Sequence, residues 1–240
     1  LAAGESVKAL YNEIRALRRA IILAHPSLDF ETLLINKAPP TLYSHNCDQY
    51  LGMHSRAGDG LTLLTNWKTK PLARSLLKGK LPAGSTCKPK LHWDAKKVVF
   101  AFCDHTADKN NRRFFLYEAA IDGSSVRQLT GTKDDPMTRW DGRRTAKIED
   151  GDPTYLPDGG IAFVSTRNKS FGRCHNGRYT PSLLLHRIDT DATTVRQLSF
   201  GEANETDPVV LPDGRMVFTR WDYINRNVTK FHMLWYTYPD

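Results

Sequence analysis

The sequence predicts an all-β fold: a partial, truncated β-propeller of about three four-stranded blades, preceded by an N-terminal helix. The main observation is a phrase, Asp-Pro-x-x-Leu-Pro-Asp-Gly, that spans residues 152–159 and returns 55 residues later at 207–214. Pro fixes φ ahead of a turn and Asp-Gly accepts positive φ inside it, so each copy is typical of a strand, a tight turn and a second strand. The structural positions of the repeat are Asp152, Asp158 and Gly159 in the first copy and Asp207, Asp213 and Gly214 in the second.

A second phrase repeats out of phase with the first. Val-Arg-Gln-Leu-Thr at 126–130 returns as Val-Arg-Gln-Leu-Ser at 195–199, and short apolar runs at 114–117 and 183–186 precede the two copies. Four short strands in a unit of about 40–55 residues are the pattern of a propeller blade. The sequence therefore predicts blades that superpose, with Phe163 and Phe218 buried at matching positions.

The N-terminal segment predicts one amphipathic helix over residues 5–25. Its apolar residues recur at steps of three and four, and Pro26 ends it; they are Val7, Leu10, Tyr11, Ile14, Leu17 and Ile21. We expect this helix to pack against the propeller as an appendage. The predicted organisation is residues 1–40 for the helix and its connecting segment and 41–240 for the blades.

The blades are expected in chain order. Residues 61–65 and 72–77 are predicted to end a first blade, a second covers 90–130 with a degenerate copy of the turn phrase at 90–97, and a third covers 152–199. A fourth begins at Asp207 and reaches its third strand at 233–238, which predicts that the propeller continues beyond the chain end.

The repeated charged residues are expected to be structural. Asp152 and Asp207 precede prolines at strand entries, where a carboxylate can accept backbone N–H groups of the turn. Arg167 and Arg220 are expected at equivalent positions, each paired with a carboxylate of a neighbouring blade.

Composition excludes few classes of protein. A net charge of +8 suggests an acidic partner, but the basic residues are dispersed and lack interleaved aromatic side chains, which argues against a nucleic-acid interface. No apolar run approaches the roughly 20 residues that span a bilayer. The four cysteines, Cys47, Cys87, Cys103 and Cys174, are compatible with two disulfides or with four buried thiols.

Two irregular stretches hold the candidate ligand sites. His45, Cys47, Asp48 and His54 offer imidazole, thiolate and carboxylate groups suited to a transition metal, and the alternative is a loop that Asp48 caps over a buried Cys47. Cys174, His175 and Tyr179, flanked by two arginines, suit an anionic ligand or a haem. The alternative for Cys174 is a disulfide with Cys103. We expect the two stretches to share a cavity at one mouth of the propeller.

Several phrases together resemble a known family. These are Ser44–Gly52, Tyr155–Gly159, Phe163–Arg167 and Leu211–Tyr223. They are similar to the TolB-type, WD-like β-propeller proteins related to the hydrazine synthase alpha subunit of planctomycete-type bacteria. The resemblance runs from about Asp29 to the C-terminus and implies an exported, periplasmic multi-domain protein. The Cys-x-x-Cys-His motif for covalent haem attachment is absent from this chain, so haem chemistry does not follow residue by residue.

Two functions are therefore expected. The first is an exported TolB-type scaffold domain that binds a ligand, a partner protein or the remaining domains of its own chain. The alternative is a domain of a hydrazine-synthase-alpha-like redox enzyme that uses haem or a metal. The sequence identifies neither a cofactor nor a catalytic residue.

Overall fold

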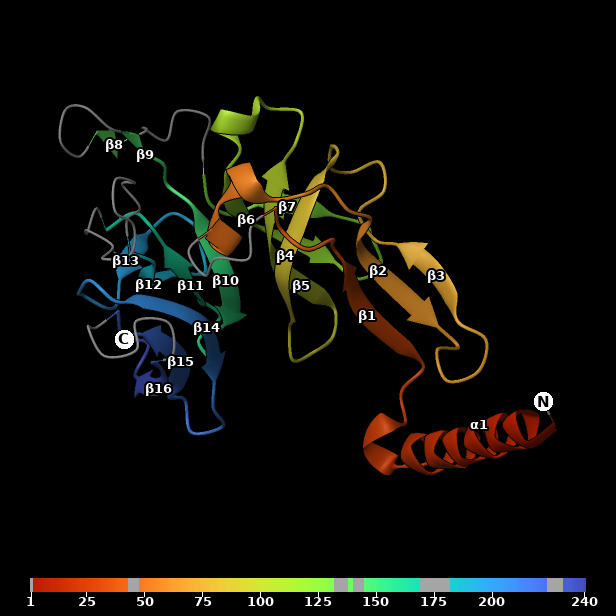
Figure 1. Cartoon of the computed structure of the whole chain (residues 1–240). Coiled ribbons are helices and arrows are strands. Elements are labelled where there is room, and N and C mark those ends of the chain that lie inside the picture. Colours follow the sequence, from red (N-terminus) through yellow and green to blue (C-terminus); the bar gives the residue numbers. More distant parts are fainter. Residues whose placement is uncertain (1, 43–47, 132–137, 140–144, 169–181, 224–230) are drawn as a thin grey trace. The chain divides into compact units, whose positions relative to one another are not determined.

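The structure of the protein is a computed structural model, and it describes residues 2–42, 48–131, 138–139, 145–168, 182–223 and 231–240. The chain divides into two compact units, residues 1–35 with 62–75 and residues 36–61 with 76–240. Antiparallel sheets make up most of the structure, and α1 is the one long helix of the described part (Figure 1). The predicted all-β class with an N-terminal helix is confirmed. No helix in the described residues has the length and apolarity to cross a membrane.

The first unit contains the helix and most of a three-stranded sheet. Helix α1 spans Ala2–Leu23 and a 3-10 turn follows at Pro26–Leu28. The sheet has the order β1-β2-β3, with β1 at Thr32–Lys37, β2 at Gly60–Thr65 and β3 at Leu72–Ser75. The apolar stripe of α1 is exposed along its whole length, so its packing against the propeller stays a prediction.

The second unit contains three successive sheets, each an antiparallel meander (Figure 1). The sheet that we call blade 2 consists of β4 (Gly84–Leu91), β5 (Lys97–Asp104), β6 (Phe114–Ala120) and β7 (Val126–Gln128). Blade 3 consists of β10 (Asp150–Tyr155), β11 (Ile161–Ser165), β12 (Leu184–Ile188) and β13 (Val195–Gln197). Blade 4 consists of β14 (Asn204–Val210), β15 (Met216–Trp221) and β16 (His232–Thr237). The first strands lie together, because β10 contacts both β4 and β14.

Short elements lie in the segments between strands. They are the 3-10 turns η2 (Asp48–Tyr50), η3 (Gly52–His54) and η4 (Lys109–Asn111) and the small hairpin of β8 (Thr138–Arg139) and β9 (Thr145–Ala146).

The turn between the first and second strands is the same in all three blades. The side chains of Asp94, Asp158 and Asp213 each accept the N–H of the residue two positions on, at 2.8, 3.0 and 3.1 Å. The residue that follows each Asp has positive φ: 56° at Ala95, 89° at Gly159 and 85° at Gly214. The repeated Asp-Gly therefore encodes a left-handed turn position, which Ala95 adopts in blade 2 at some steric cost.

A buried phenylalanine marks the second strand of each blade. Each ring lies two residues after the residue that pairs with the last residue of the preceding strand. The rings are Phe100, Phe163 and Phe218, and the paired residues before them are Val98, Ile161 and Met216. All three rings are buried, so the predicted burial of Phe163 and Phe218 is confirmed. Phe163 packs with residues of blades 2 and 3, and Phe218 packs with residues of blades 3 and 4, so consecutive blades share a core.

The second repeated phrase fixes the fourth strand to the third. The hydroxyl of Thr130 accepts the N–H of Leu116 at 3.0 Å, and the hydroxyl of Ser199 accepts the N–H of Leu185 at 2.9 Å. Gln128 and Gln197 donate to the carbonyls of those same two hydroxyl residues. The phrase repeats because blades 2 and 3 both close their outer edge with these hydrogen bonds.

The expected equivalence of Arg167 and Arg220 is wrong. The strand register aligns Arg220 with Ser165, since Glu205 faces Arg220 and Asp150 faces Ser165. Arg167 makes a bidentate pair with Asp150 of its own blade, at 3.0 and 2.6 Å. Arg220 instead contacts Asp222, two residues further along, at 3.1 Å. Neither of these pairs joins neighbouring blades.

Candidate functional site

The first strand of each blade contains a bulge with a residue in the left-handed region. These residues are Lys88, Asp152 and Asp207, with φ of 47°, 46° and 53°, and the strand register shifts at each of them. A proline follows each one and disfavours the right-handed helical region. A bulge re-aims a side chain, and a left-handed non-glycine residue costs energy that the surroundings must offset.

Polar contacts among these three residues offset that cost. Lys88 Nζ lies 2.6 Å from Asp207 Oδ1, and the backbone N–H of Asp207 donates to Asp152 Oδ2 at 2.8 Å. One residue from each blade therefore joins a single network. Asp152 and Asp207 are linked to the neighbouring blades, whereas their own turns had been expected to supply the partners.

The electrostatics of this network depend on burial. Asp152 is only 2% exposed, and its burial raises the pKa of the carboxyl to about 6 although Lys88 acts to lower it. Burial alone would lower the pKa of Lys88, but Asp152 and Asp207 outweigh it and raise that pKa. The Oδ1 atom of Asp152 is buried and has no hydrogen-bond partner in the described part of the chain.

Tyr50 approaches this network from outside the blades. The turn η2 brings it there, and its phenol lies beside Thr206 and interacts with the carboxylates of Asp152 and Asp207. Burial, reinforced by Asp152 and Asp207, raises the pKa of Tyr50, so the phenol stays neutral and can act as a hydrogen-bond donor.

Glu149 anchors the segment that carries Tyr50. Its buried carboxylate accepts the N–H of Gly52 at 3.0 and 3.1 Å and the N–H of Phe114 at 2.8 Å. Burial raises the pKa of this carboxyl to about 8. A Cβ at position 52 would lie 2.8 Å from the backbone of Arg113, so the segment can approach this closely only with glycine.

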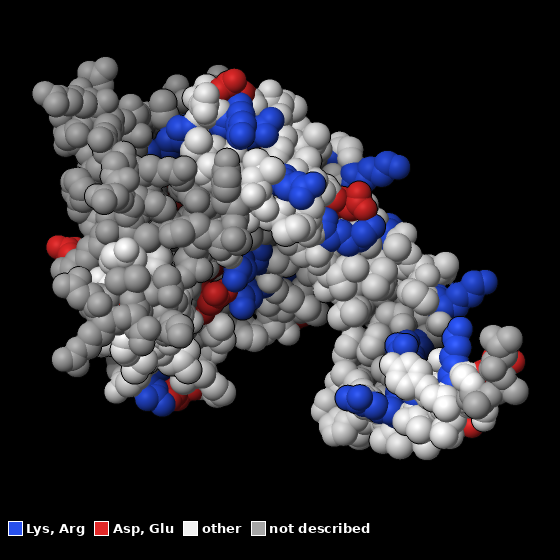
Figure 2. All heavy atoms as spheres, in the orientation of Figure 1, with Lys and Arg blue, Asp and Glu red and all other residues white. Residues whose placement is uncertain are grey.

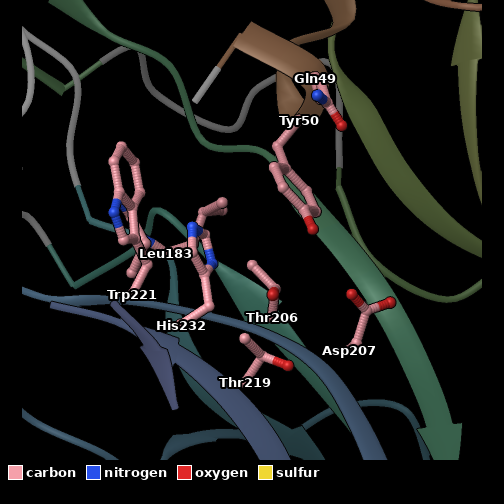
Figure 3. Close-up of a pocket in the computed structure, with 9 residues that line it drawn as sticks. Gln49, Tyr50, Leu183, Thr206, Asp207, Thr219, Trp221 and His232 are labelled. Atoms are coloured by element: carbon pink, nitrogen blue, oxygen red, sulfur yellow. The ribbon is translucent and has the colours of Figure 1, made fainter. Parts of the chain in front are cut away.

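A pocket of about 170 Å³ opens beside Tyr50 (Figure 3). The rings of Trp221 and His232 stack in parallel on one side, with centroids 5.6 Å apart, and Thr206 and Asp207 lie on the other. The lining residues are Gln49, Tyr50, Leu183, Asn204, Thr206, Asp207, Thr219, Trp221 and His232. Amide, hydroxyl, carboxylate and aromatic groups thus meet around one small hollow, as they do in small-molecule sites.

The structure covers only part of the predicted sites. His45, Cys47, Cys174, His175 and Tyr179 lie outside the described residues. Asp48 begins η2 and His54 is buried at the end of η3, so both belong to the segment that Glu149 anchors. The described residues include no group of three or more potential metal ligands. The metal and haem sites stay predictions.

Two cysteines are free thiols in the described residues, Cys87 and Cys103. Burial raises the pKa of each to about 12, which makes both weak nucleophiles at neutral pH. The free thiol of Cys103, 3.7 Å from the carbonyl oxygen of Gly52, goes against the predicted bridge to Cys174.

The sequence contained a usable signal for Lys88 that our predictions did not use. Lys88-Pro89 stands six residues before Asp94, as Asp152-Pro153 stands six before Asp158, so Lys88 replaces the repeated Asp of the bulge. No comparable signal marks Glu149, Trp221 or His232 as site residues, because their roles depend on contacts between distant segments.

Comparison with known proteins supports the fold. The structure is similar to Kuenenia stuttgartiensis hydrazine synthase, with a TM-score of 0.62 and 19% identity over 88% of this chain and 30% of that one. A putative TolB from Agrobacterium tumefaciens gives a TM-score of 0.44 and 21% identity over 68% of this chain and 46% of that one. No protein-family model and no curated protein sequence matches the chain.

The chain thus spans about a third of the hydrazine synthase chain that it matches. At this level of identity the likeness concerns the fold alone. It agrees with the resemblance that the sequence phrases suggested. The repeated blades and this likeness together show that the chain has a fold of the β-propeller type.

Proposed function

We propose that the chain is an exported β-propeller scaffold domain of a larger protein, and that it binds a small polar ligand in the pocket beside Tyr50. The observation that carries this proposal is the contrast between repeated and unrepeated residues. The repeated Asp, Gly and Phe positions hold turns and shared cores, whereas Gln49, Tyr50, Trp221 and His232 meet at one place only.

The lining of the pocket indicates the class of ligand. Its volume of about 170 Å³ is below the roughly 300–1,000 Å³ of sites for drug-sized molecules. Asp207 and the amides of Gln49 and Asn204 supply acceptors and donors, and the Trp221–His232 pair supplies a flat aromatic wall. These groups suit a compact molecule with several hydroxyl, amide or amino groups and one apolar face.

Ligand-observed NMR with a panel of monosaccharides, free amino acids and small amides tests this function. We expect at least one class to show saturation transfer that His232→Ala weakens about tenfold or more, because that change removes one wall of the pocket. His25→Ala, in the first unit, is the matched control and should bind as the unchanged protein does. Binding by no member of the panel, or equal binding by His232→Ala, would contradict the proposal.

Blade 4 supports the scaffold role. Met233, Leu234, Trp235 and Tyr236 on β16 are all exposed, and no described strand pairs with the second edge of β16. Exposed apolar strands of this kind are normally covered by another strand or a partner. We propose that further blades of the same protein, or a partner protein, cover β16.

Site-specific photo-cross-linking in the natural, full-length protein tests this role. A photoreactive residue at Leu234 should cross-link to a segment outside residues 1–240 or to another protein. The same residue at Phe200, which is exposed on a loop, should give no specific product. Cross-links from Leu234 that fall only within residues 1–240 would argue against a covering partner.

Extracytoplasmic location is part of the proposal and rests on the sequence resemblance. Fractionation of the native host, with the full-length protein followed by antibody, should find it outside the cytoplasm.

A further inference from the structure

The apolar stripe of α1 follows a strict heptad. Val7, Ile14 and Ile21 fall at position a, and Leu10 and Leu17 fall at position d. All five side chains are exposed, between 57% and 69%. Apolar side chains at alternating steps of three and four form the seam of a coiled coil. Here that seam is fully formed on a 22-residue helix and open to solvent.

The residue types at the seam select an oligomeric state. β-Branched residues at a, combined with leucine at d, favour two parallel strands over three or four. Every a position on α1 is Val or Ile, and both d positions between them are Leu.

The charges beside the seam agree with a parallel pair. Glu13 falls at position g and Arg18 at position e of the next heptad. In a parallel two-stranded coil the g residue of one helix lies next to the e residue five positions later on the other. Glu13 of one copy therefore meets Arg18 of the other, and twofold symmetry forms the pair twice.

Contacts on the opposite side of α1 leave the seam accessible within the first unit. Arg19, at position f, donates from Nη2 to the carbonyl of Lys68 at 3.1 Å, in the turn between β2 and β3. Position f faces away from the a and d residues. The hairpin thus holds the polar side of the helix, and its seam stays available.

From this geometry we propose that α1 binds α1 of a second copy of the chain as a parallel, in-register coiled coil. This proposal differs from the expectation from sequence, in which the apolar stripe packs against the propeller of the same chain. It is independent of the ligand pocket and of β16. Because fewer than four heptads are present, the dimer is of moderate affinity and depends on protein concentration.

A membrane surface is the main competing occupant, since α1 also carries Lys8, Arg15 and Arg19. The observations favour a second helix. Glu13 borders the apolar stripe, where it would face anionic lipid, and the alternation of β-branched residues with leucine has no role on a lipid surface.

Disulfide trapping in the natural, full-length protein tests orientation and register. In a glutathione redox buffer, Leu17→Cys should form a covalent dimer, because d positions face each other in a parallel coil. Asn12→Cys, on the opposite side of the helix, is the matched control and should form no covalent dimer. The unchanged chain, run alongside, accounts for native cysteines. Absence of the covalent Leu17→Cys dimer would overturn the proposal. An antiparallel arrangement of the two helices would be one cause of that result.

Sedimentation equilibrium tests the seam and its charges. Ile14→Asp should abolish the dimer and Asn12→Asp should not, with the unfolding transition of the propeller unchanged in both. Glu13→Arg should weaken the dimer about tenfold, and adding Arg18→Glu should restore it, since the reversed pair attracts again. A monomer at all micromolar to millimolar loadings, a dimer that survives Ile14→Asp, or no rescue by the double variant would each overturn the proposal. So would binding of the unchanged chain to anionic vesicles that Ile14→Asp abolishes.

Discussion

The central residues are held in unfavourable states by the contacts around them. Lys88, Asp152 and Asp207 have positive φ, which costs on the order of 1–3 kcal/mol each for a non-glycine residue. Glu149 and Asp152 are in addition buried acids, and both have raised pKa values. Local strain of this kind persists only where neighbouring contacts determine the conformation, and here those contacts join three blades and the Tyr50 segment.

The titration of Asp152 gives a prediction about stability and pH. Burial raises its pKa from the ordinary 3.8 to about 6, so the folded state holds this proton more tightly than the unfolded state. The contribution of Asp152 to the free energy of unfolding therefore falls as pH rises from about 4 to 6, by about 2–3 kcal/mol. Asp152→Asn removes the titrating group, so the stability of the variant relative to the unchanged protein should rise by that amount over this range.

Urea unfolding of both proteins at pH 4, 5, 6 and 7 provides the measurement. Other carboxyls, such as Asp94 and Glu118, have lowered pKa values and change stability with the opposite sign, but they contribute equally to both proteins. The prediction therefore concerns only the difference in the free energy of unfolding between the two proteins. A difference that stays constant across this pH range would show that Asp152 does not titrate there.

At the scale of elements, local turn chemistry made the blades predictable from sequence. The Asp-Gly turns and the paired Val-Arg-Gln-Leu phrases encode hydrogen bonds between residues close in the chain, so the same letters return in each blade. Lys88 replaces the Asp of the repeated phrase but has the same backbone conformation as Asp152 and Asp207, so the sequence prediction missed Lys88. Glu149 lay in a stretch without periodicity, and its partners Gly52 and Phe114 are distant in sequence. The pocket could not be predicted for the same reason.

The shared phenylalanine of the second strands gives a prediction about packing. Phe218→Ala should lower the free energy of unfolding by about 3–5 kcal/mol, because the cavity would open in the core that blades 3 and 4 share. Phe200→Ala is the matched control on an exposed loop and should change stability by less than about 0.5 kcal/mol. Chemical denaturation followed by circular dichroism measures both. Similar effects for the two variants would mean that Phe218 is not a core residue.

At the scale of the whole molecule, the described parts of blades 2, 3 and 4 are held together by contacts between neighbouring blades. The core around Phe163 draws on blades 2 and 3, the core around Phe218 on blades 3 and 4, and the polar network at the first strands touches all three. Charge is dispersed: Figure 2 shows Lys and Arg spread over the visible face with Asp and Glu among them. That nucleic acid is not the partner stays a prediction from the sequence.

The scaffold proposal predicts an absorption spectrum without a haem band. A haem bound by His45, Cys47, His175 or Tyr179 would give a Soret band, and a transition metal would appear by elemental analysis of the purified full-length protein. We expect neither signal, because the proposed ligand site around Tyr50 is built from groups that suit a polar organic molecule. A stoichiometric haem or metal that the double substitution of Cys47 and His175 removes would favour the redox alternative.

The final prediction concerns the ion pair that joins blades 2 and 4. Lys88 and Asp207 lie 2.6 Å apart with side chains 40% and 45% exposed, so water screens part of their attraction. A double-mutant cycle with Lys88→Met and Asp207→Asn should give a coupling energy of about 0.5–1 kcal/mol. The pair Lys37–Asp59, with side chains 47% and 70% exposed and within the second unit, is the matched control and should couple more weakly.

Because Lys88 also acts to lower the pKa of Asp152, Lys88→Met should shift the Asp152-dependent fall in stability to higher pH. No coupling between Lys88 and Asp207, together with an unshifted pH profile, would mean that Lys88 does not help to hold the three bulges.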